Sequence, residues 1–185
     1  LRPKSSFVAR SLSTLRLLKT LESNHNNPPL CQAPDQVLKK PGLVLCEHAT
    51  DCHAHICGPA SVYPYSPKRI YTPPDALLPQ YQTLLQSIGI ERAVLVQPSI
   101  YADDNRALLA ALKTDLLNLR GVAVVDWDIS ERDLEKMHHA GVRGVRCNIV
   151  DLADAKGVLP ILKLRYLADK IAPFGWHLEF LMHVN

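Results

Sequence analysis

Two histidines stand one residue apart in the stretch TDCHAHICGP, residues 50–59. On a β-strand, residues two apart point to the same side, so His53 and His55 are expected to share one face with Asp51. Neutral imidazoles bind divalent metal ions, and imidazoles that donate a proton stabilise a developing oxyanion. The pair therefore predicts a chemical site, either with or without a metal, ahead of a purely structural role in a polar core.

Short apolar runs alternate with amphipathic segments from residue 49 onward. The predicted strands are residues 49–56, 92–99, 121–128, 141–148 and 176–184, and the predicted helices are residues 73–89, 102–119, 130–141 and 159–175. This alternation indicates βαβ units and a parallel sheet, as an open doubly wound sheet or a (β/α)₈ barrel. No G-x-G-x-x-G motif follows a strand, which weakens the nucleotide-binding sheet. A barrel needs about 250 residues, so this chain accounts for about five of eight units.

Polar residues recur where the predicted strands end. They are Gln97 and Ser99, Asp126 and Asp128, Arg146 and Asn148, and finally His183. The carboxyl ends of parallel strands form the functional face of both candidate architectures, so these side chains are expected to converge on His53 and His55. Arg146 suits a substrate carboxylate through its planar guanidinium. Arg143, three residues earlier, is expected to face the helices or the barrel bottom instead.

Composition and charge limit the function and set the domain boundaries. The apolar and charged fractions, 47% and 21%, are ordinary for a globular domain. The net charge of +3 comes from residues 1–21, which hold five Lys or Arg and no acid, so the rest carries −2 and does not predict a nucleic-acid binder. We expect a basic amphipathic extension over residues 1–22, a linker over 23–48 and a barrel-type domain over 49–185. No run is long enough to span a membrane.

Cysteine usage and the N-terminal composition bear on location. The chain has five cysteines and no CxxC pair, which favours free thiols in a reducing compartment. We therefore expect a cytoplasmic protein. The Arg-, Ser- and Leu-rich composition of residues 1–22 keeps a mitochondrial location as the alternative.

From Asp51 onward the sequence resembles the amidohydrolase superfamily, in particular the branch that contains 2-pyrone-4,6-dicarboxylate lactonase and other small lactone hydrolases. The resemblance rests on DCHAHICGPASVYPYSPKRIYTPPDA, VLVQPSIYADDNRALLAALK, RGVAVVD, HHAGVRGVRCN and GWH. It implies a (β/α)₈ barrel, present here as about five βα units. It further implies that His53 and His55 face the carbonyl under attack, and that Tyr71, Ser99 and Arg146 contact substrate.

The resemblance also has departures. The family's strand-six histidine and strand-eight aspartate, the residue that activates water, are absent from these 185 residues, so the chain by itself is expected to be C-terminally truncated and inactive. The segment after the fourth strand, basic in the dicarboxylate enzyme, reads VDLADAKG here. Asp151 and Asp154 would repel a second substrate carboxylate.

Three functions follow. The first is hydrolysis, in the complete protein, of a small carboxylated or sugar-derived lactone without a cofactor. In the second, His53, His55 and His183 hold a zinc or manganese ion for metal-assisted hydrolysis or decarboxylation. In the third, the chain is an inactive fragment that serves at most as an interaction module. A small molecule is the expected partner in the enzymatic cases, and the sequence leaves the oligomeric state open.

Overall fold

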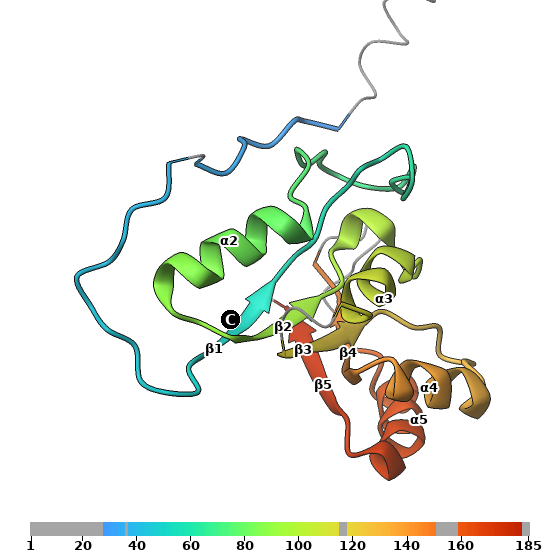
Figure 1. Cartoon of the computed structure of the whole chain (residues 1–185). Coiled ribbons are helices and arrows are strands. Elements are labelled where there is room, and N and C mark those ends of the chain that lie inside the picture. The colour runs from blue at the N-terminus through green and yellow to red at the C-terminus, as the bar shows by residue number, and fades with distance from the viewer. Residues whose placement is uncertain (1–27, 36, 115–117, 151–158, 183–185) are drawn as a thin grey trace, which may run out of the picture.

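A computed structural model describes residues 28–35, 37–114, 118–150 and 159–182. Five parallel strands form one sheet in the order β1-β2-β3-β4-β5. Their bounds are Thr50–Ala54, Arg92–Val96, Asn118–Ala123, Val142–Asn148 and His177–Leu181. Sequential order with every pair parallel is the topology of part of a (β/α)₈ barrel, and the sheet is curled accordingly (Figure 1). The predicted fold class is confirmed.

Four α-helices connect the strands and flank the outside of the sheet (Figure 1). They are α2 (Leu78–Ile88), α3 (Arg106–Leu112), α4 (Glu131–His139) and α5 (Ile161–Ile171), with short 3₁₀ turns η1 (Ser99–Tyr101) and η2 (Ala172–Phe174). Local signals end them as expected. Gly89 closes α2 in the left-handed conformation at φ 77°, and Ser130 opens α4 by accepting a hydrogen bond from the Asp133 amide at 3.1 Å.

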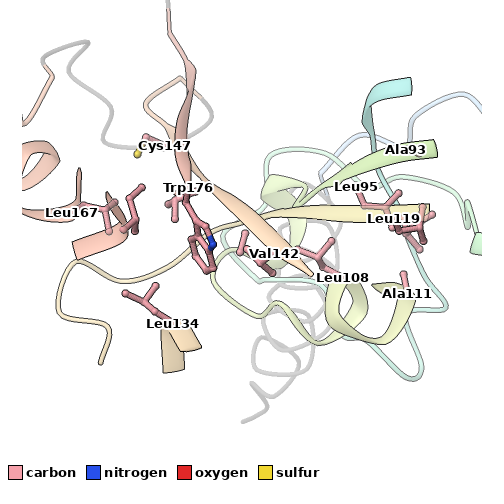
Figure 2. Close-up of a cluster of buried hydrophobic side chains, with 14 of the residues drawn as sticks. Ala93, Leu95, Leu108, Ala111, Leu119, Leu134, Val142, Cys147, Leu167 and Trp176 are labelled. Atoms are coloured by element: carbon pink, nitrogen blue, oxygen red, sulfur yellow. The ribbon is translucent and has the colours of Figure 1, made fainter. Parts of the chain in front are cut away.

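The core lies between the sheet and these helices. Side chains of alternate strand residues, such as Leu95 and Val145, meet Leu85, Leu134 and Leu167 from α2, α4 and α5, and all five are almost wholly buried. Figure 2 shows strand and helix side chains meeting in this cluster. Because side chains alternate along a strand, residues between these positions point to the inner face, where the site lies.

Several element boundaries differ from the prediction, among them those of β3 and α3. Strand β3 was expected over residues 121–128 but runs from Asn118 to Ala123, and α3 ends at Leu112 although its periodic pattern continues to residue 119. The segment before Gly121 fits either element by its pattern, and pairing of β3 with Arg92–Val96 decides it. Asn105 holds the N-cap position of α3; its side-chain amide donates to the Val124 carbonyl, and its side-chain oxygen accepts from the Val124 amide.

Part of the predicted linker contacts the domain. Leu30 forms a parallel bridge with Thr72, and the amide of Cys31 donates to the Thr72 carbonyl at 2.9 Å. The extension over residues 1–22 lies outside the described residues. Within the part of the chain that the structure describes, no helix is long and apolar enough to cross a membrane.

Replacing Trp176 with phenylalanine is expected to lower the free energy of unfolding by about 1–2 kcal/mol. The indole Nε1 donates to His138 Nδ1 at 3.0 Å, and the two rings stack at an interplanar angle of 15°. Phenylalanine keeps an aromatic ring in the cluster but loses the donor. Urea denaturation of both proteins measures the difference, and equal midpoints and slopes would contradict it.

Candidate functional site

A bulge in β1 decides which of its side chains reach the inner face. Asp51 pairs with Ala93 and Ala54 with Leu95, so β1 advances three residues while β2 advances two. Asp51 consequently accepts a hydrogen bond from the Tyr81 hydroxyl of α2 at 2.8 Å. The prediction that Asp51 shares a face with the two histidines is wrong, because the extra residue shifts the alternation before His53.

His53 and His55 do lie together. Their ring centroids are 5.0 Å apart in an edge-to-face arrangement. His53 is about half exposed and its Nδ1 lies 3.6 Å from Glu179 Oε1 of β5. The histidine pair therefore reaches across the inner face from the first strand to the fifth.

A backbone carbonyl fixes the proton position on His55. Its Nδ1 lies 2.7 Å from the Val96 carbonyl oxygen at the end of β2. A carbonyl only accepts, so Nδ1 carries the proton and the neutral ring has its lone pair on Nε2. Burial lowers the pKa of His55 from its ordinary value, and the positive charges of Arg146 and His53 lower it further, against the opposing hydrogen bond to Val96. His55 is thus a neutral acceptor at neutral pH.

Arg146 lies deep on the inner face of β4. It is 8% exposed, and its Nη1 donates to the Gln97 carbonyl oxygen at 2.9 Å. Gln97 is itself fully buried, and its side-chain amide donates to the Asp104 carbonyl at 2.8 Å. This chain of bonds ties the loop after β2 to Arg146, which holds the guanidinium in one orientation.

Glu179 was not among the residues predicted for the site. The register pairs it directly with Arg146, and its Oε1 lies 4.0 Å from Arg146 Nε. That nitrogen is buried and has no hydrogen-bond partner among the described residues. Period-two alternation along His177–Leu181 places Glu179 on the inner face, and this signal in the sequence could have identified it.

Tyr71 and Ser99 lie together, as their predicted roles require. The Ser99 hydroxyl donates to the Tyr71 hydroxyl oxygen at 3.3 Å. Ser99 begins η1, two residues after Gln97, and Tyr71 packs against a second buried cluster that contains Ile100 and Tyr101. The pair therefore stands in the loops that follow the strands, at the end of the sheet that carries Arg146.

Other strand-end residues do not join the site. Asp126 and Asp128 are exposed in the turn after β3, where Asp126 Oδ1 accepts from the Trp127 amide, because the strand ends at Ala123. Arg143 donates to the His138 carbonyl at 2.7 Å, which confirms that it faces the helices. His183, like Asp151 and Asp154, lies outside the described residues.

The alternative with a metal depends on a third ligand. Among residues 28–182, apart from the undescribed gaps, no group of three His, Cys, Asp or Glu side chains is arranged to hold a metal ion. His53 and His55 supply two nitrogens, and the third residue of that prediction, His183, is not described. The described residues thus supply part of a donor set, which leaves the metal site a prediction.

A cavity of about 350 Å³ adjoins His55 on the side of α2. Its walls include Leu38, Leu77, Tyr81 and Leu84. The cavity is mainly apolar, and His55 forms part of its wall beside α2.

The stability of the protein is expected to fall as the pH drops below about 6.5, the ordinary histidine pKa, because of His55. The unfolded chain takes up the proton at its ordinary pKa, whereas folded His55 takes it up only at lower pH. Stability is therefore fully present above pH 6.5 and is lost as the pH falls toward the folded pKa. Urea denaturation across this range should show a shallower loss for H55N than for the unmodified protein, and parallel losses would contradict the assignment.

The same part of the chain matches a known protein family. The amidohydrolase family model Amidohydro_2 matches residues 50–184, which include every strand and both histidines. The chain belongs to this amidohydrolase family. The match begins at β1 and therefore excludes the N-terminal 49 residues.

Individual relatives of this amidohydrolase chain are named for small anionic lactones. This chain is 42% identical over 139 residues to a 2-pyrone-4,6-dicarboxylate hydrolase of Comamonas testosteroni; the alignment covers 75% of this chain and 45% of the relative. It is 36% identical over 118 residues to a 4-sulfomuconolactone hydrolase of Rhizobium radiobacter, covering 64% and 40%. A solved Pseudomonas putida structure assigned as a 2-pyrone-4,6-dicarboxylic acid hydrolase matches with a TM-score of 0.61 at 37% identity, covering 74% and 49%. The chain spans less than half the length of each relative.

Proposed function

We propose that the full-length protein hydrolyses a small lactone that carries a carboxylate, by attack of water on the ring carbonyl. The observation that carries this proposal is the convergence of His53, His55 and Arg146 on one face, at the carboxyl end of parallel strands. The relatives named for 2-pyrone-4,6-dicarboxylate and 4-sulfomuconolactone hydrolysis support a ring of this kind.

Each side chain has a distinct task in this reaction. Arg146 binds the carboxylate, because its fixed guanidinium offers parallel N–H donors to a planar anion. Tyr71 and Ser99 orient the ring through their hydroxyl groups. His53 donates to the oxygen that becomes negative in the tetrahedral intermediate. The neutral His55 accepts a proton through Nε2, because its Nδ1 proton is held by Val96. Donation from His55 to the oxyanion, as first expected, would require the protonated ring.

The test is ring opening by the full-length protein across a panel of lactones with and without a carboxylate, followed by pH-stat titration of the acid released. Hydrolysis of carboxylated members ahead of neutral ones is expected. An absence of ring opening with every member would overturn the proposal.

A metal-dependent variant of the same proposal rests on the tautomer of His55. The unprotonated Nε2 nitrogen that can accept a proton could also bind a divalent metal ion. Such an ion would polarise the carbonyl and activate water. His53 and His55 would hold the ion together with groups outside the described residues. Metal analysis of the purified protein, together with activity after chelation, separates the two forms: stoichiometric zinc or manganese and loss of activity on chelation would establish the metal form.

A further inference from the structure

A carboxylate shares the inner face with the arginine that we assign to substrate binding. Glu179 Oε1 lies 4.0 Å from Arg146 Nε and 3.6 Å from His53 Nδ1. Its side chain is 25% exposed, against 7% for the side chain of Arg146, so Glu179 stands on the more open side of the pair. A ligand that approaches Arg146 from this side meets Glu179 first.

The donors of Arg146 are already partly engaged. Nη1 is bound to the Gln97 carbonyl oxygen, and Nε is buried beside Glu179 without a hydrogen bond. The guanidinium therefore keeps only part of its donor set for a ligand. The positive charge that would attract an anion is also offset by the carboxylate beside it, because opposite charges 4 Å apart cancel most of each other's field at longer range.

We propose that Glu179 is a specificity-determining residue that limits the substrate to one carboxylate. One carboxylate can bind the remaining donors of Arg146 on the side away from Glu179. A second carboxylate on the same ring would lie within range of the Glu179 oxygens. The Arg146–Glu179 pair offers no second cation to compensate that charge. The inference rests on the proposed function for the identity of the ligand, but it concerns charge selection and not the chemical step.

The experiment compares two planar probes that contain no ester bond and cannot be hydrolysed. Benzoate carries one carboxylate, and isophthalate carries two on the same ring. Isothermal titration calorimetry measures the affinity of the full-length protein for each. The variants are E179Q, which removes the charge at nearly constant shape, and E179A, which removes charge and volume. E135Q is the matched control, because Glu135 is exposed on α4.

The ratio of isophthalate to benzoate affinity is expected to rise about tenfold in E179Q and E179A, the size of effect for a partly exposed charge pair at this distance. E135Q should leave the ratio unchanged. An unchanged ratio in both Glu179 variants, an equal rise in E135Q, or no binding of either probe to the unmodified protein would each overturn the inference. Circular dichroism confirms that the variants fold.

The outcome separates this inference from the proposed function. A shifted ratio in a protein that opens no lactone supports the role of Glu179 and rejects hydrolysis. Lactone turnover with an unchanged affinity ratio supports hydrolysis and rejects the role of Glu179.

Discussion

Replacing His55 with asparagine is expected to lower kcat for lactone hydrolysis by about 10²–10⁴-fold, the contribution typical of a positioned proton acceptor. The asparagine amide can still donate to the Val96 carbonyl, so the bond that His55 Nδ1 makes at 2.7 Å has a substitute. What disappears is the Nε2 lone pair. The loss should therefore appear in kcat, with the far-ultraviolet circular dichroism spectrum unchanged.

The control for this substitution is H139N. His139 is exposed on α4 and undergoes the same chemical change away from the inner face. Its kcat should equal that of the unmodified protein. A kcat for H55N within a factor of about two of the unmodified value would show that His55 takes no part in the chemical step.

Replacing Arg146 with methionine is expected to raise KM for a carboxylated lactone by about 30-fold to several thousandfold, because truncating a buried charged partner of a ligand costs about 2–5 kcal/mol. Arg146 is only 8% exposed, and methionine is an unbranched apolar side chain that can occupy much of the same buried space without a charge. A lactone without a carboxylate should lose much less affinity, because it makes no ion pair with the guanidinium.

R143M is the matched control, three residues earlier on the same strand. Arg143 donates to the His138 carbonyl on the helix side, so its loss should affect stability and leave KM close to its original value. Equal effects of R146M and R143M, or equal losses for charged and neutral lactones, would contradict the assignment of Arg146 to carboxylate binding.

The sequence predicted the elements well because each carries a local signal. Apolar runs separated by amphipathic segments indicate the parallel strands, and Gly89 and Ser130 mark helix ends through their own backbone and side-chain chemistry. The position of β3 was less predictable. Residues 118–121 carry no local signal that separates helix from strand, and pairing with a neighbouring strand decides between them.

The site was predictable only where alternation holds. The spacing of His53 and His55 predicted that they share a face, and Arg146 was predicted from its place near the end of its strand; the structure brings the three together on the inner face. Asp51 was misplaced because a β-bulge leaves no clear mark in a single sequence. The Gln97 and Val96 carbonyl oxygens, which hold Arg146 and His55, belong to the backbone and carry no residue-type signal. Glu179 follows the alternation along β5 and was therefore predictable as an inner-face residue.

The most direct test is a crystal structure of the full-length protein with benzoate or a non-hydrolysable lactone analogue that carries one carboxylate. We predict a carboxylate on the Arg146 guanidinium at hydrogen-bond distance, about 2.7–2.9 Å, with the ring between Tyr71 and the two imidazoles. A ligand bound instead in the cavity beside α2, with Arg146 still bonded only to Gln97 and His53 and His55 turned away from the ring, would contradict the proposed site.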